Sequence, residues 1–157
     1  MLYLGGINLH ASLLPRYRGA APINWALYHG ETETGVSVIH MTPRVDAGPL
    51  IAKASTPIGA HETADALEER LSALGAPLLA DSIDAIEAGT AEEIEQDAAL
   101  VSTAPRLKKS DGLLDWSRPA QALCDHVRAF VPWPNAFTFW LREGGEPLRL
   151  VLGPLEV

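Results

Sequence analysis

Residues 34–41 constrain the fold of this chain more than any other segment. Their sequence, TGVSVIHM, holds no lysine, arginine, aspartate or glutamate, and its branched residues fall on both faces of an extended strand. A strand that is apolar on both faces is typical of a sheet covered on both sides, as in the parallel sheets of α/β proteins. The segment therefore predicts a central strand in a layered α/β domain.

The flanking segments alternate between strand and helix patterns. Apolar alternation predicts strands at 7–10 and 50–58, and a proline at the first helical position predicts a helix that begins at Pro22. Leucines at helical spacing predict a helix over 64–75, followed by a second helical run over 77–88. This succession favours an α/β fold over an all-helical or all-β one.

The pattern changes in the second half of the chain and predicts three parts. Residues 1–91 carry the α/β pattern, and the periodicity then fades over 92–105, which we interpret as a linker. Residues 106–157 begin with a helix and continue with two alternating segments, 136–141 and 148–152, joined by a glycine-rich turn. We expect the start of a small β-rich domain there.

Composition fits an ordinary globular protein. The chain has 157 residues, of which 47% are hydrophobic and 20% are charged. No apolar run approaches the roughly 20 residues that span a bilayer, so we expect a cytoplasmic protein with no membrane partner. A single cysteine, Cys124, permits neither an internal disulfide nor a cysteine-based zinc site, and we expect no metal.

The charge balance limits the possible partners. A net charge of −8 argues against a wholly basic nucleic-acid-binding surface, because affinity for phosphates comes from clustered lysine and arginine. Two local basic clusters remain, Arg16 with Arg18, and Arg106 with Lys108 and Lys109. The second cluster is also explained by a solvated linker.

Three polar residues suggest a reactive site. Asn8 and His10 share one face of the predicted strand at 7–10, and Asp46 follows the strand at 34–41. If the two strands are parallel neighbours, these side chains meet at one edge of the sheet. An amide and an imidazole can stabilise a carbonyl oxygen that gains charge, and a carboxylate can accept a proton, so the set favours acyl transfer. A structural histidine and a plain Asp-x-Gly turn are the alternative explanation.

Longer motifs extend this set. The runs NLHASLLP at 8–15, RYRGAAP at 16–22 and DAG at 46–48 together resemble the folate-dependent formyltransferases, and within them the branch that acts on methionyl-tRNA. Segments 107–116 and 128–134 resemble the linker exit and the C-terminal domain of the same family. The resemblance implies the C-terminal half of a Rossmann-like catalytic domain with parallel strands, followed by a linker and the start of a small OB-like β-barrel.

The resemblance also implies a reaction. A formyl group passes from 10-formyltetrahydrofolate, the co-substrate, to the amino group of initiator methionyl-tRNA in translation initiation, without a metal. Asn8, His10 and Asp46 match the catalytic residues of the family. Residues expected to line the folate site are Ser12, Leu13, Leu14 and Pro15, and those expected to contact tRNA are Arg16, Arg18, Lys108 and Lys109.

Two alternatives and one departure stay open. The acceptor could instead be a nucleotide-linked amino sugar, as in the sugar N-formyltransferases, or the chain could be a non-catalytic remnant that binds folate or RNA. Members of the family have further strands before the Asn-x-His strand, whereas only residues 1–6 precede it here. We therefore expect a fragment that lacks activity on its own.

Overall fold

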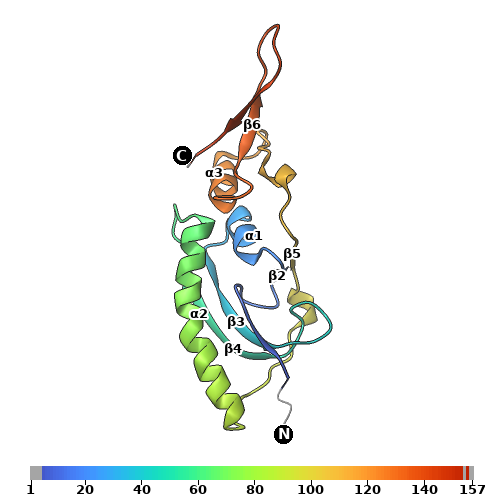
Figure 1. The fold of residues 1–157 in the computed structure, drawn as a ribbon, viewed down its shortest axis with the longest axis vertical. Helices are drawn as coiled ribbons and strands as arrows, with labels where there is room; N and C mark the ends of the chain where they lie inside the picture. The colour runs from blue at the N-terminus through green and yellow to red at the C-terminus, as the bar shows by residue number, and fades with distance from the viewer. Residues whose placement is uncertain (1–4, 154, 156–157) are drawn as a thin grey trace.

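A computed structural model describes residues 5–153 and residue 155 of the chain. Figure 1 shows a three-stranded sheet with a long helix along it, and a smaller unit of one helix and one hairpin that projects from one end. The elements in chain order are β1 (Ile7–His10), β2 (Arg18–Gly19), α1 (Pro22–Tyr28), β3 (Glu33–His40), β4 (Leu50–Pro57), α2 (Ala64–Glu87), η1 (Ala98–Leu100), β5 (Thr103–Ala104), η2 (Lys109–Gly112), α3 (Ala120–Ala129), β6 (Phe137–Trp140) and β7 (Leu148–Val151).

The main sheet has the order β1-β3-β4, and both of its strand pairs are antiparallel. The prediction of parallel strands is therefore wrong for this sheet, and the connections explain why. The connection between β1 and β3, residues 11–32, holds only a 7-residue helix, α1, and does not form the helical crossover that is usual for a parallel pair. The link between β3 and β4, residues 41–49, is shorter than the dozen or so residues of a parallel crossover. Among the described strands, parallel pairing is found between β2 and β5.

The burial predicted for the strand at 34–41 is confirmed over residues 34–39, whereas Met41 is exposed, and the layer that covers the second face of the strand is not a helix. Every residue from Thr34 to Ile39 is buried. Val36 belongs to the core beneath α2, whereas Ile39 packs on the opposite face against Leu14. The turn that follows β1 thus covers the face that a second helical layer covers in a parallel sheet.

The two helical runs predicted on either side of Pro77 form one helix, α2. Pro77 cannot donate to the carbonyl of Ala73, but both residues are exposed and water can replace the missing donor, so the helix continues. Its buried side lies close to the sheet, since a Cβ on Gly75 would come within 2.6 Å of a Leu9 methyl. No helix within residues 5–153 combines the length and apolarity of a membrane-spanning segment.

The C-terminal unit shares its core with the sheet and the helices that pack on it. Phe130, the residue after α3, is fully buried in one cluster with Leu27 of α1 and Leu67 of α2. The amide of Asn24 in α1 donates a 2.7 Å hydrogen bond to the carbonyl of Ala129. Two segments distant in sequence are therefore held together by apolar burial and a hydrogen bond.

Acid is expected to loosen this junction through His126. The ring is 3% exposed and packs edge-on against Tyr28 and Phe130, and burial together with Arg118 lowers the pKa of His126 below its ordinary value of 6.5. The unfolded chain takes up a proton below about pH 6.5 while the folded chain resists it, so stability must fall as pH drops through that range.

Urea unfolding of the 157-residue chain at pH 7 and pH 5 measures this loss. His126→Phe keeps the aromatic contacts and removes the titrating group, so we expect the variant to lose less stability than the parent between the two pH values. His61→Phe, at an exposed histidine, is the matched control and should behave like the parent. An equal loss in parent and His126→Phe would rule out His126 as the source.

Candidate active site

The structure brings Asn8, His10 and Asp46 together; we call these three residues the polar trio. The Asp46 carboxylate lies between the other two, with Oδ1 3.5 Å from Asn8 Nδ2 and Oδ2 3.5 Å from His10 Nδ1. The side chains of His10 and Asp46 are 6% and 13% exposed. Charge on this carboxylate is therefore poorly screened by water and is felt by both neighbours.

The polar trio meets by a different path from the one predicted. In the antiparallel register His10 lies opposite Ser37, and the carboxyl end of β3 lies at the other end of β1, where His40 is opposite Ile7. The loop over 41–49 bridges this distance, because it brings Asp46 within 3.5 Å of both Asn8 and His10. Proximity of the three side chains thus depends on the shape of this loop and not on neighbouring strand ends.

Main-chain groups from the segment before α1 orient the polar trio. His10 Nε2 donates to the carbonyl of Tyr17 at 2.9 Å; a carbonyl can only accept, so this nitrogen carries a hydrogen. The N–H of Gly19 donates to Asp46 Oδ2 at 2.9 Å. Tyr17 and Asp46 both have positive φ, at 61° and 48°, which is uncommon for residues with a Cβ. This backbone conformation costs free energy, so the contacts around Tyr17 and Asp46 must hold both residues in place.

Tyr17 is itself fixed by a polar cluster on the far side of its ring. Its hydroxyl donates to Glu31 at 2.7 Å, and Arg16 pairs with the same carboxylate. Burial, followed by the hydrogen bond to Glu31, raises the pKa of the Tyr17 hydroxyl, and the hydrogen bond to Glu31 raises the pKa of Arg16. Tyr17 is thus a neutral donor at physiological pH, and the cluster holds the carbonyl that His10 contacts.

The four residues expected to line a folate site form a compact turn after β1. Ser12 and Leu14 are each 1% exposed and Pro15 is buried, whereas Leu13 is partly exposed. The hydroxyl of Ser12 donates to the carbonyl of Arg16 at 2.7 Å, which closes the turn. These side chains therefore stabilise the turn itself.

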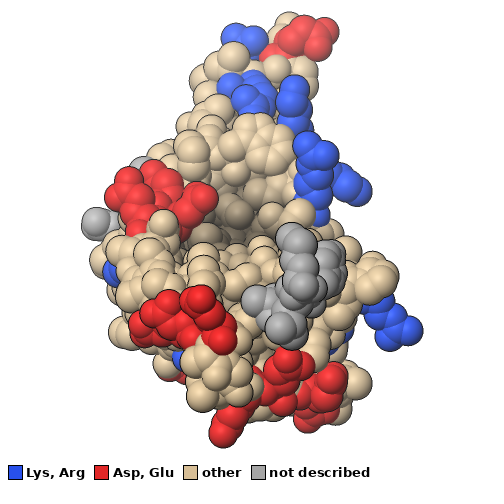
Figure 2. Space-filling view, turned by 60° about the horizontal axis from the view of Figure 1, so that its bottom comes forward, with Lys and Arg blue, Asp and Glu red and all other residues tan. Residues whose placement is uncertain are grey.

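The residues expected to contact tRNA divide into two kinds. Arg16 is paired as described above, and the Arg18 guanidinium donates to Gln96 from Nε and Nη2, at 3.1 and 2.8 Å. Lys108 and Lys109 are exposed at the start of η2. Figure 2 shows several lysine and arginine side chains along one side of the upper part of the molecule, with basic and acidic groups next to each other at its tip.

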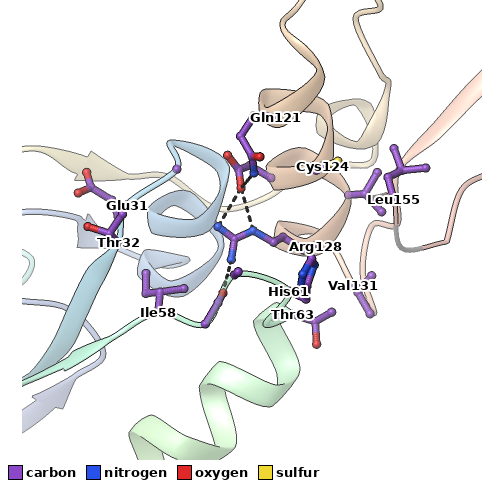
Figure 3. Close-up of a pocket in the computed structure, with 15 residues that line it drawn as sticks. Glu31, Thr32, Ile58, His61, Thr63, Gln121, Cys124, Arg128, Val131 and Leu155 are labelled. Atoms are coloured by element: carbon purple, nitrogen blue, oxygen red, sulfur yellow. Dashed lines mark hydrogen bonds and ion pairs between the residues drawn. The ribbon is translucent and has the colours of Figure 1, made fainter. Parts of the chain in front are cut away.

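Two cavities lie outside the polar trio. The larger, about 470 Å³, separates α3 from the turn before α2. Figure 3 shows Arg128 at its centre, where Nε donates to Asp125 at 2.8 Å and Nη1 donates to the carbonyl of Gly59 at 2.9 Å. These contacts connect α3 to the turn before α2, so we interpret the role of Arg128 in this pocket as structural. The smaller cavity, about 250 Å³, is lined in part by Ala11, the residue after His10, and by the start of α1.

Three contributors to the site were missed from the sequence. The carbonyl of Tyr17 and the N–H of Gly19 are main-chain groups, and no residue type encodes their direction. Gln96 lies in the segment interpreted as a linker, and a lone glutamine gives no signal in a single sequence. Its neighbour Ile94 forms an isolated bridge with Leu50, which anchors the segment beside the sheet.

Comparison with solved structures defines the class of the fold. An N-formyltransferase from Helicobacter canadensis, in complex with folinic acid and dTDP-3-aminofucose, matches with a TM-score of 0.74 and 21% identity over 94% of this chain and 62% of that one. A 4-N formyltransferase from Francisella tularensis matches with a TM-score of 0.77 and 18% identity over 96% of this chain and 63% of that one. The predicted α/β formyltransferase fold is confirmed.

The chain belongs to the formyl transferase family. Residues 1–83 match the formyl transferase model of that family, and residues 106–153 match the model of its C-terminal domain. A methionyl-tRNA formyltransferase from Citrifermentans bemidjiense is 53% identical over 86% of this chain and 42% of its own length. One from Rhodopirellula baltica is 48% identical over 95% of this chain and 47% of its own. The chain thus spans less than half the length of these relatives.

Proposed function

We propose that this chain contributes the catalytic residues of a formyl transfer from 10-formyltetrahydrofolate to the amino group of initiator methionyl-tRNA. The observation that carries the proposal is a carboxylate, Asp46, that lies 3.5 Å from both the amide of Asn8 and the imidazole of His10. Folinic acid in the Helicobacter canadensis enzyme supports a folate donor. The curated relatives at about 50% identity support methionyl-tRNA as the acceptor.

The polar trio divides the chemistry among its members. A neutral amine attacks the formyl carbon and gives a tetrahedral species with an anionic oxygen. The Asn8 amide has two N–H groups, of which one faces Asp46. The second can donate to the anionic oxygen of the tetrahedral species. The ring of His10, held in place through Nε2, presents Nδ1 on the same side as the carboxylate.

We assign proton transfer between the two nitrogens to Asp46. The attacking nitrogen loses one proton as its bond to the formyl carbon forms, and the folate nitrogen gains one as its bond to that carbon breaks, so no proton is consumed overall. A carboxylate beside the Asn8 amide and the His10 ring can accept the first proton and return the second. Burial around it keeps bulk water from competing for the formyl carbon.

Binding is assigned to two other regions. We place the folate donor against the turn of Ser12 to Pro15, which directly follows His10. Lys108 and Lys109, both exposed, offer charge to a tRNA phosphate backbone, and salt is expected to weaken that contact. Arg16 and Arg18 are assigned to the same substrate, Arg18 through Nη1, since its Nε and Nη2 donate to Gln96.

A competition assay tests the acceptor. The complete gene product is given 10-formyltetrahydrofolate with equal concentrations of initiator methionyl-tRNA and a nucleotide-linked amino sugar, and the products are separated by mass. Formyl-methionyl-tRNA is expected, and N-acetylated methionyl-tRNA, which lacks the free amine, is the control that should stay unmodified. Formylation of the sugar alone would overturn the assignment of the acceptor. Binding of the folate without any product would favour the non-catalytic alternative.

A further inference from the structure

Gln96 connects two segments that form the active site. Its Nε2 donates to the carbonyls of Asp46 and Gly48, at 2.8 and 2.7 Å. Its Oε1 accepts from Arg18 Nε and Nη2, at 3.1 and 2.8 Å. One half-buried amide thus joins the loop over 41–49 to β2.

The chemistry of the partners fixes the orientation of this amide. Carbonyl oxygens only accept hydrogen bonds and a guanidinium only donates them, so the nitrogen must face the loop and the oxygen must face Arg18. Both N–H groups and the oxygen of Gln96 are then in use. A carboxylate at this position could keep the contact with Arg18, but it could not serve the two carbonyls.

Besides Gln96, the loop is held by the Gly19 N–H on Asp46 Oδ2 at 2.9 Å and by two bonds of its own to the carbonyl of Arg44, from the Thr42 hydroxyl at 3.0 Å and the Ala47 N–H at 3.5 Å. Residues 41–45 are exposed, and Asp46 itself adopts a left-handed backbone conformation with φ of 48°. Gly48 is pressed against the sheet, because a Cβ there would come within 1.8 Å of the carbonyl oxygen of His40. The carbonyls to which Gln96 donates belong to Asp46 and to Gly48 itself. The Gln96 amide therefore stabilises the backbone conformation that directs the Asp46 carboxylate toward His10.

We infer that Gln96 is a positioning residue that holds Asp46 against the Gly19 N–H and His10. The effect on the position of Asp46 follows from the contacts above, whereas the effect on turnover rests on the proposed function. Arg18 anchors Gln96, because its guanidinium donates to the Oε1 atom of that residue. Gly19, the residue after Arg18, contacts the Asp46 carboxylate through its N–H.

Amide hydrogen exchange of Gly19 tests the inference without any substrate. Gln96→Glu removes both donors to the loop and keeps an acceptor for Arg18, and Gln96→Leu removes every polar contact. In the 157-residue chain, both variants should raise the exchange rate of the Gly19 amide by about tenfold, since its bond to Asp46 is weakened. Gln121→Leu makes the same change on α3 and should leave Gly19 unchanged.

Amides of β3 and α2 report whether a variant has lost global stability. If their exchange rises as well, Gln96→Asn, which keeps both amide functions but is one methylene shorter, replaces the harsher variants. Unchanged Gly19 exchange in every Gln96 variant whose β3 amides stay protected would overturn the inference.

The kinetic arm uses the complete gene product. Gln96→Glu should lower kcat for formyl transfer by about tenfold and leave KM for the folate donor within about twofold, because the reacting group moves and the donor site does not. A rise in KM with kcat unchanged would contradict positioning. Absence of formyl transfer in the parent would instead count against the proposed function, and the Gly19 result would still decide the inference.

Discussion

Replacing Asp46 by asparagine is expected to lower the rate of formyl transfer by at least about a hundredfold, the usual range for loss of a general acid–base group. Asparagine has nearly the same shape, and its side-chain oxygen can still accept the 2.9 Å hydrogen bond from Gly19. The variant loses the ability to take a proton and the negative charge beside His10. Single-turnover transfer by the complete gene product, with methionyl-tRNA in excess, measures the chemical step.

Asp81→Asn is the matched control, because Asp81 is exposed on α2 and the substitution changes net charge by the same amount. It should leave the rate unchanged. Titration of both variants with 5-formyltetrahydrofolate separates binding from chemistry, and we expect parent-like affinity in Asp46→Asn. A rate within twofold of the parent would remove Asp46 from the mechanism, whatever its position.

Truncation of Phe130 to alanine is expected to cost about 3–5 kcal/mol of unfolding free energy, as for other fully buried aromatic residues. Its ring packs edge-on to Trp25 at 6.0 Å and against Tyr28 at 5.6 Å, both on α1. A typical domain is stable by only about 5–15 kcal/mol, so the variant should be close to unfolding at moderate temperature. Urea unfolding of the 157-residue chain, followed by tryptophan fluorescence, gives the value.

Phe139→Ala provides the comparison, since Phe139 is 46% exposed on the projecting hairpin. We expect a loss below about 1 kcal/mol there, because the removed surface is already half in water. Equal losses for the two variants would show that Phe130 does not join α3 to α1. The difference between them therefore tests the shared core directly.

The chemistry of the site was predictable to the level of residue types. Asn8 and His10 follow from the two-residue period of a strand, and Asp46 follows from its motif. Their catalytic roles remain a proposal. The support around them was not predictable, because Gly19 acts through its main chain and Gln96 acts across 50 residues of sequence.

Local patterns alone predicted the longer strands and helices, whereas the two-residue strands β2 and β5 and the short helices η1 and η2 were missed. Alternation and helical spacing arise from contacts between near neighbours, so β1, β3, β4, α1 and the hairpin were all predicted close to their observed bounds. The motifs likewise determined the family, which the matches over residues 1–83 and 106–153 confirm.

Tertiary structure decided strand direction, the continuity of α2 and the path by which Asp46 reaches His10. Each of these depends on what a segment meets far along the chain. The short link over 41–49 favours antiparallel pairing of β3 with β4. The helix α2 continues because the proline faces water while the opposite side packs on the sheet, and Gln96 helps to shape the loop over 41–49. A periodic pattern records which face of an element is apolar, but it does not record which partner covers that face.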